Sequence, residues 1–334
     1  MYDEKLGYSL WLDFVERDFL RESFPAMIEK GMVNGATSNP SIFANAITTS
    51  PAYAEQLETL SDASPKEKYE ALAIEDIRQA ALALRGRYDE GDEGYISIEV
   101  DPFLSDDTGA TLAEARRLFK AIGQPNVMIK VPATEAGYPV MEALLGEGIS
   151  VNATLVFSPD QARKCLSAMK SGIDEFGNTG GERVDAVISV FVSRFDRLLD
   201  DRLKELGLPT AQTGIMNAAR IYHIIESNHT PSVQTLFAST GVKGDDLPTD
   251  YYVRKLCAPH AINTAPLHTI EAALSMELPD KSQLPDPEAI DAFFDRLAEA
   301  GIEMDAVYGE LLEDGLQAFE EAFAQMLKAL ETSQ

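Results

Sequence analysis

The sequence predicts an α/β fold, a single (β/α)8 TIM barrel, on three observations. Eight strand-like runs alternate with helix-like stretches along the chain, which is the pattern of βα units in a parallel sheet. Several runs alternate apolar and polar residues, as expected when one strand face meets helices and the other faces a barrel lumen. No low-complexity linker divides the 334 residues, so we expect one domain over residues 1–334.

The strand-like runs are rich in β-branched and apolar residues, and helix signals follow them. Pro40 suits the first position of a helix. Asp107 or Thr108 is placed to cap a helix that ends at Gly123. In order, the runs are 9–13, 32–39, 95–101, 126–131, 148–157, 184–192, 232–240 and 257–265.

Two stretches exceed the bare repeat. Residues of about 50–90 predict extra helices between the second and third strands, and residues of about 286–333 predict two helices after the last strand. Within 286–333, apolar residues such as Leu311, Phe319 and Phe323 recur at three- and four-residue spacing. That spacing predicts an amphipathic helix packed on the barrel.

Composition excludes some classes of function. The formal net charge of -27 argues against binding nucleic acid or an anionic membrane. A phosphate-ester substrate would therefore need basic residues concentrated locally. Cys165 and Cys257 are far apart and form no CxxC pair, which fits a reducing compartment. We read no signal peptide and no transmembrane span, and expect a cytoplasmic protein.

The segment NVMIKVPAT (126–134) places Lys130 inside an apolar run that predicts a strand. A buried ammonium is costly unless it is paired or gives up its proton. A structural salt bridge is the commoner fate of a buried lysine. The alternative is a lysine kept partly neutral as a nucleophile toward carbonyls. The residues alone leave both open.

Strand alternation places Lys130 on the same kind of face as other polar residues. In 148–155, for example, Val151, Ala153 and Leu155 oppose Ser150, Asn152 and Thr154. In a barrel the polar faces point into the lumen, near the strand ends where barrel active sites lie. The alternative is a polar network that only plugs the barrel mouth. We expect these residues to converge on one pocket: Asp13, Asn39, Glu99, Lys130, Asn152, Thr154 and Ser189.

Schiff-base chemistry accounts for this set better than other chemistries. At an unperturbed pKa of about 10.4, a lysine is neutral roughly once in a thousand at pH 7.5. Carboxylates such as Asp13 and Glu99 can move the protons that a Schiff base requires, with Thr154 positioning a water. The four histidines have no metal-ligand spacing, so we expect no metal. The sequence contains no GxGxxG after the first strand, no Walker A loop and no GxSxG elbow.

Five segments, in order, resemble those of transaldolases, and the likeness runs from about residue 9 to the C-terminal helices. TSNP by itself is weak, but the ordered set is specific. The segments are TSNPSIF (37–43), IEVDPFL (98–104), NVMIKVPATEAG (126–137), GISVNATLVFS (148–158) and ISVFVSRFD (188–196).

The resemblance implies a role for each matching residue. Lys130 is similar to the Schiff-base nucleophile, and Asp13 and Glu99 to the acid/base residues, with Thr154 holding the catalytic water. Arg194 resembles the phosphate-binding arginine, and its place at a helix start also suits an anion. The positions that resemble substrate-binding residues are Asn39, Asn152, Ser189 and Phe191.

One segment departs from the commoner pattern. Many transaldolases carry a second arginine after the seventh strand, in a segment resembling ASFRN, whereas this chain reads FASTGVKGDD. That segment is similar to the branch of the family with an ASTGTK-like stretch. Ser239 and Lys243 are the candidate substitutes for the second half of the phosphate site.

The resemblance implies transfer of a dihydroxyacetone unit between sugar phosphates, with no cofactor. Typical pairs are sedoheptulose 7-phosphate with glyceraldehyde 3-phosphate, and fructose 6-phosphate with erythrose 4-phosphate. We expect a monomer or homodimer. The nearest rival is a shorter aldolase that splits fructose 6-phosphate and tends to carry Gln at Glu99 and Tyr at Phe191. A catalytically dead barrel would have lost Lys130, Glu99 and Asp13.

Overall fold

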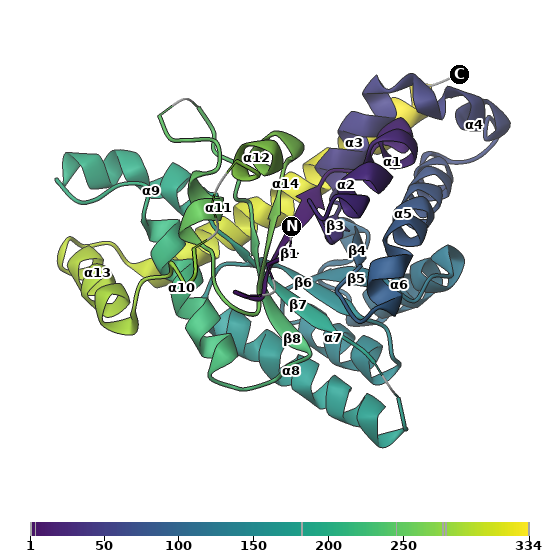
Figure 1. The fold of residues 1–334 in the computed structure, drawn as a ribbon. Helices are drawn as coiled ribbons and strands as arrows, with labels where there is room; N and C mark the ends of the chain where they lie inside the picture. Colours follow the sequence, from purple (N-terminus) through teal and green to yellow (C-terminus); the bar gives the residue numbers. More distant parts are fainter. Residues whose placement is uncertain are drawn as a thin grey trace.

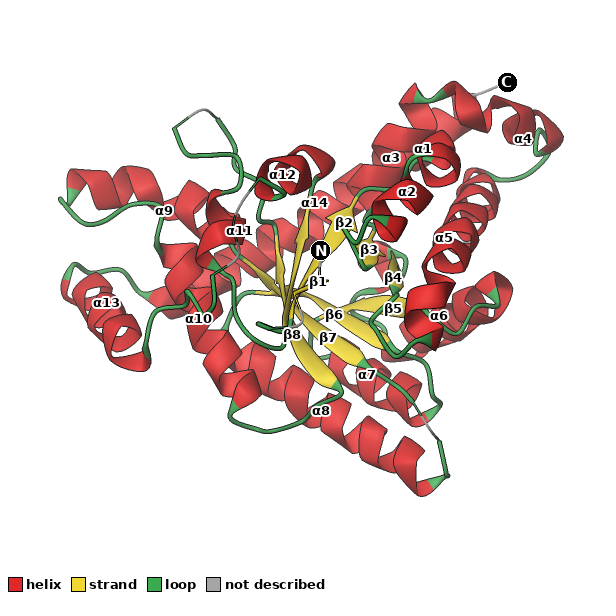
Figure 2. Cartoon of the chain, in the orientation of Figure 1, coloured by secondary structure: helices red, strands yellow, loops and turns green. Residues whose placement is uncertain are grey.

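A closed barrel of parallel strands forms the centre of the structure (Figures 1 and 2). The structure is a computed structural model, and it describes residues 2–3, 5–181, 183–244, 246–275, 277 and 279–332. Each strand pairs with the next, and the last pairs in parallel with the first to close the barrel, which confirms the predicted fold. A short strand, β1 (Tyr2–Asp3), adds to β2 in the antiparallel sense. The barrel strands are β2 (Tyr8–Asp13), β3 (Gly35–Thr37), β4 (Ile96–Glu99), β5 (Val127–Pro132), β6 (Val151–Val156), β7 (Ala186–Phe191), β8 (Val233–Ala238) and β9 (Ala261–Ala265).

Helices surround the barrel and include both predicted additions. Asp107 caps α6 by accepting a hydrogen bond from Ala110 N, and Gly123 ends that helix at φ 68°. No described helix is both long and apolar enough to cross a membrane. The helices are α1 (Arg17–Glu22), α2 (Phe24–Glu29), α3 (Pro40–Thr49), η1 (Pro51–Tyr53), α4 (Ala54–Thr59), α5 (Pro65–Asp89), η2 (Pro102–Leu104), α6 (Thr108–Ile122), α7 (Gly137–Gly146), α8 (Pro159–Asn178), α9 (Ser193–Glu205), α10 (Thr213–Glu226), α11 (Tyr251–Lys255), α12 (Leu267–Ala273), α13 (Pro287–Glu299) and α14 (Met304–Thr332).

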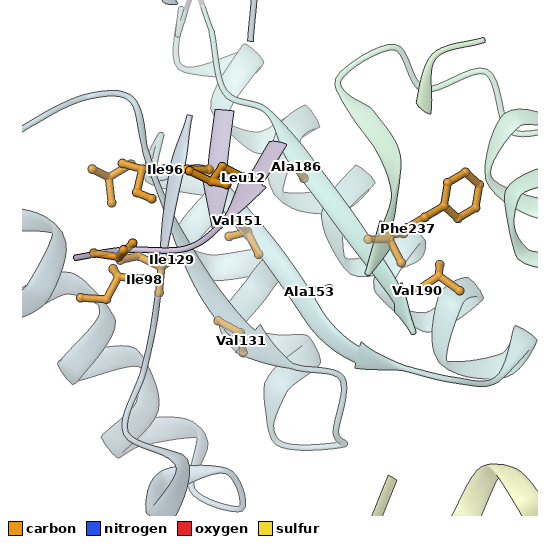
Figure 3. Packing of buried hydrophobic residues seen from close by; sticks show 14 of the residues in the cluster. Leu12, Ile96, Ile98, Ile129, Val131, Val151, Ala153, Ala186, Val190 and Phe237 are labelled. Atoms are coloured by element: carbon orange, nitrogen blue, oxygen red, sulfur yellow. The ribbon is translucent and has the colours of Figure 1, made fainter. Parts of the chain in front are cut away.

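The two faces of the strands form two separate apolar clusters. The outer faces pack beneath the helices, and Figure 3 shows residues of this layer such as Ile98, Ile129 and Val151. The inner faces contribute Trp11, Met128 and others to the second cluster. Trp11 lies beside Gly35 in the register of β2 and β3, and a Cβ at Gly35 would be 2.4 Å from the indole ring. Gly35 therefore leaves room for the Trp11 indole ring, which fills part of the barrel lumen.

In β6 the predicted alternation fails after Ala153. The sequence places Leu155 on the outer face, but the register shifts between Ala153 and Val156, and Leu155 takes φ 56°. A bulge inserts one extra residue and moves the following side chains to the other face. Leu155 consequently joins the inner cluster, and Val156 packs with the outer cluster.

The helical insertion after β3 is joined to the segment after β2 by a buried ion pair. Arg17 Nε donates to Asp76 Oδ1 at 2.8 Å, and Tyr53 OH donates to Asp76 Oδ2 at 2.8 Å. The Arg17 side chain is 4% exposed and that of Asp76 is 0% exposed. Gln56 accepts from Arg17 Nη1 at 2.6 Å. The insertion thereby supports the segment that follows Asp13 at the end of β2.

The C-terminal helix α14 runs diagonally across the barrel from α13 to α3 (Figure 1, yellow). It contacts α3, α5, α9, η2 and β6, segments that are far apart in the sequence. Its Phe323 meets Tyr69 of α5 edge to face, with ring centroids 5.2 Å apart. The prediction of an amphipathic helix packed on the barrel is confirmed.

Removing the buried acid of the insertion should destabilise the chain strongly. We expect Asp76→Ala to lower the free energy of unfolding by about 3 kcal/mol or more, because it leaves the Arg17 guanidinium buried without its partner. Asp89→Ala removes an exposed partner of Arg85 and should cost less than about 0.5 kcal/mol. Urea denaturation followed by circular dichroism measures both, and equal losses would contradict the structural role of the pair.

Candidate active site

A cavity of about 180 Å³ opens where the barrel strands end. It draws side chains from β2, β3, β5, β7, β8 and β9, from α3 and α9, and from the C-terminal helix α14. Seven of the residues that the sequence singles out line it: Asp13, Asn39, Lys130, Ser189, Phe191, Arg194 and Ser239.

Lys130 lies near the end of β5 with its amine buried. Its Nζ donates a hydrogen bond to Ser38 O at 3.0 Å and lies 3.8 Å from Glu99 Oε2. The side chains of Lys130 and Glu99 are 7% and 3% exposed. They face each other because the register of β4 and β5 pairs the two residues. At 3.8 Å the carboxylate is close enough for an ion pair but too far for a hydrogen bond.

The carboxyl group of Glu99 is partly protonated near neutral pH because its pKa is raised. Burial raises the pKa of its carboxyl group to about 7, against the opposing effect of the Lys130 charge. Both carboxyl oxygens are buried, and neither has a hydrogen-bond partner among the described residues. A carboxyl group with a pKa close to the working pH suits general acid and base catalysis.

Asp13 ends β2 and is oriented by a chain of hydroxyl groups from the two neighbouring strands. Thr37 Oγ1 donates to Asp13 Oδ1 at 2.7 Å and lies 2.7 Å from Thr264 Oγ1. Since Thr37 gives its proton to Asp13, Thr264 is the donor to Thr37. Burial raises the pKa of Asp13, and the nearby Lys130 opposes that rise.

A second hydrogen-bonded chain lies under the cavity. Ser189 Oγ donates to Asn152 Oδ1 at 2.6 Å, and Asn152 Nδ2 donates to Ser97 Oγ at 3.0 Å. Asn152 is the register partner of Lys130 and is fully buried. Thr154 is also fully buried, and its Oγ1 has no hydrogen-bond partner among the described residues. Asn152, Thr154 and Glu99 do not line the cavity, whereas Lys130 and Ser189, which are also buried, do.

The candidate anion-binding residues divide between the cavity and the surface. Arg194 is half-buried, with its guanidinium 5.3 Å from the ring centroid of Phe191, and burial lowers its pKa. Ser239 lies in the cavity at φ 55°, with its Oγ 3.0 Å from Ser193 Oγ. Lys243 is exposed and does not line the cavity.

Asn39 has two tasks at the cavity edge. It is the N-cap of α3, where its Oδ1 accepts from Ile42 N at 3.0 Å. Because the cap uses only the amide oxygen, the amide nitrogen is the group suited to bind a ligand in the cavity.

Sequence reasoning missed several residues that line the cavity: Thr37, Ser41, Ala238, Thr264 and Phe319. Thr37 and Ser41 lie within the quoted segment 37–43, and Thr264 lies near the end of a predicted strand, so position gave a usable signal. No sequence signal marked Phe319 as a cavity residue, since its spacing in α14 is that of any packing residue.

A larger cavity, of about 790 Å³, opens at the opposite end of the barrel. Its Glu93 accepts hydrogen bonds from Trp11 Nε1 at 2.5 Å and Ser9 Oγ at 2.8 Å, and its Arg183 is paired with Asp185 at 2.8 Å. The N-terminal end of a barrel generally serves stability. Size therefore does not identify the site, and we place it at the smaller cavity, which holds the buried Lys130 amine together with Asp13 at the strand ends.

The raised pKa of Glu99 predicts a pH-dependent stability. The folded value of about 7 exceeds the ordinary 4.5, so the folded chain holds the proton between these values and stability falls as the pH rises through them. Glu99→Gln should remove this loss, and its stability relative to the native chain should increase by on the order of 2 kcal/mol between pH 5 and 8. Urea unfolding at several pH values measures it. Glu310→Gln, on an exposed part of α14, is the charge control, and the same pH trend in both variants would contradict the assignment.

Comparison with known proteins gives the family. A family model described as Transaldolase/Fructose-6-phosphate aldolase matches residues 10–330. A transaldolase of Campylobacter jejuni (strain RM1221) is 45% identical over 331 residues, covering 97% of this chain and 99% of that protein. A transaldolase of Helicobacter pylori (strain P12) is 44% identical over 325 residues, covering 96% of this chain and 99% of that protein. The chain therefore belongs to the transaldolase/fructose-6-phosphate aldolase family.

Proposed function

We propose that this chain is a transaldolase that moves a dihydroxyacetone unit between sugar phosphates through a Schiff base on Lys130. The observation that carries the proposal is the buried amine of Lys130, 3.8 Å from Glu99 and in one cavity with Asp13. The full-length relatives named transaldolase support it. The substrates would be sedoheptulose 7-phosphate or fructose 6-phosphate as donor, and glyceraldehyde 3-phosphate or erythrose 4-phosphate as acceptor.

The first steps join the donor to the enzyme. The neutral amine of Lys130 attacks the ketose carbonyl carbon, and the carbonyl oxygen leaves as water once it has been protonated. Glu99 is the group suited to give that proton, because its pKa of about 7 keeps it partly protonated and it lies beside the amine. The buried hydroxyl of Thr154, which has no partner among the described residues, would hold the water.

In the next steps the aldehyde product leaves and a second aldehyde takes its place. Asp13 lines the open cavity, so it is placed to take the proton from the hydroxyl group next to the bond that breaks. The bonding electrons move into the lysine-bound three-carbon unit, and the aldose phosphate leaves. The second aldehyde adds by the reverse steps, and hydrolysis frees Lys130. The lysine acts as the electron sink, so no cofactor enters the proposal.

The remaining residues would bind the sugar phosphate. Asn39 and Ser189 line the cavity beside Lys130 and suit substrate hydroxyl groups, and Asn152 orients Ser189 from below. Arg194 suits the phosphate group, and its guanidinium lies over the Phe191 ring. Ser239 lies in the same cavity, whereas Lys243 would have to move to reach a ligand there.

The second candidate is simple cleavage of fructose 6-phosphate, since the family description covers both activities. Glu99 and Phe191 favour transfer, because the cleaving relatives tend to carry Gln and Tyr at these places. The buried, separate Cys165 and Cys257 are consistent with a cytoplasmic location. One domain over residues 1–334 and a monomeric or homodimeric state remain predictions.

Trapping with borohydride tests the nucleophile. Reduction in the presence of fructose 6-phosphate should fix a dihydroxyacetone adduct on Lys130, because only an imine is reduced to a stable amine. Peptide mapping by mass spectrometry locates it. Lys68 is the internal control, since it is buried at 5% exposure but its Nζ donates to Leu330 O away from the cavity. An adduct on Lys68, or on no lysine, would refute the proposed mechanism.

Acceptor dependence separates transfer from cleavage. With fructose 6-phosphate as donor, erythrose 4-phosphate should accelerate glyceraldehyde 3-phosphate release at least tenfold, because the lysine-bound unit waits for an aldehyde. A coupled assay for glyceraldehyde 3-phosphate measures this rate. Equal release with and without erythrose 4-phosphate would favour the cleaving aldolase instead.

A further inference from the structure

One residue of α14, Gly315, lies against the candidate phosphate-binding arginine. It is buried, and a Cβ at this position would be 3.0 Å from Leu155 Cδ2, 3.3 Å from Arg194 Nη1 and 3.5 Å from Phe157 Cε2. Four residues further along the same helix, Phe319 lines the cavity. One face of α14 thus forms a wall beside both the guanidinium and the cavity.

A Cβ at position 315 would come closest to Leu155, but Arg194 is the neighbour that packing holds least. Leu155 is fully buried in the β6 bulge, and Phe157 is fully buried between the rings of Phe191 and Phe195, at 5.4 and 6.0 Å. A close-packed core yields little to an added methyl group. Arg194 is half-buried and faces the cavity, and no described residue accepts a hydrogen bond from it.

We propose that Gly315 is a positioning residue for substrate binding. Its missing side chain leaves the space in which the Arg194 guanidinium lies over the Phe191 ring and faces the cavity. Bidentate binding of a phosphate group depends on the position and plane of that fork. The inference rests on the proposed function, and it extends the phosphate site from the barrel strands to the C-terminal helix.

Three variants test this role. Gly315→Ala should weaken binding of inorganic phosphate roughly ten- to a hundredfold, as expected for loss of one charge-assisted hydrogen bond. It should raise KM for fructose 6-phosphate similarly, while kcat changes less than twofold. Gly309→Ala is the matched control, because a Cβ at Gly309 of the same helix meets nothing within 4 Å. Arg194→Ala is the reference for loss of the guanidinium. Isothermal titration calorimetry measures phosphate binding, and steady-state assays give KM and kcat.

The double variant Gly315→Ala with Arg194→Ala separates positioning from a general packing effect. If Gly315 acts through Arg194, alanine at 315 should weaken phosphate binding no further once the guanidinium is gone. An added loss in that background would overturn the proposal, as would native-like phosphate binding by Gly315→Ala or an equal loss in Gly309→Ala. A Gly315→Ala chain that fails to fold would also overturn it, since the strain would then fall on Leu155 and Phe157.

The proposed function is checked separately in the same preparation. The native chain and Gly309→Ala should both form a borohydride-trapped adduct of unphosphorylated dihydroxyacetone on Lys130. Absence of that adduct refutes the transaldolase proposal, whatever the phosphate titrations give. Its presence, together with unchanged phosphate binding in Gly315→Ala, refutes only the inference about α14.

Discussion

The burial of the Lys130 amine beside the Glu99 carboxyl group is the constraint on which the site depends. Neither group would remain there without the closed barrel, because adjacent parallel strands bring both to the same level of the lumen. Burial raises the pKa of Glu99 to about 7, so this carboxyl group can gain or lose a proton near neutrality. Removing water from these groups costs free energy, and the helices that pack on the outer faces of the strands supply the compensating apolar burial.

The two ends of the barrel use buried carboxyl groups in opposite ways. Glu93 also has a pKa raised to about 7 by burial, but both of its oxygens accept hydrogen bonds at the edge of the larger cavity. Glu99 and Thr154 keep buried oxygens without a partner among the described residues. A polar atom left in this state needs a reason, and a bound substrate or water supplies one. The hydrogen bonds of Glu93 and Glu99, rather than their pKa values, distinguish these two carboxyl groups.

One segment outside the eight βα units lines the cavity, and another packs near it. The insertion supports the segment after β2 through the Arg17–Asp76 pair, close in sequence to Asp13. The helix α14 crosses the barrel (Figure 1) and brings Phe319 to the cavity and Gly315 to Arg194. The composition of both segments is that of packing elements. Their contacts near the candidate site are with residues that are distant in the sequence.

The sequence by itself determined the barrel, the strand order and the residue types that meet at the strand ends. Alternation along a strand is a local property, because side chains two residues apart point to the same face. Asp13, Lys130 and Ser189 follow from that rule. Tertiary structure alone decided the bulge that turns Leu155 inward, the hydroxyl chain from Thr264 through Thr37 to Asp13, the exposed place of Lys243, and the reach of α14 across the cavity. These depend on barrel closure and on packing between segments far apart in the chain, and no local pattern of residues records either.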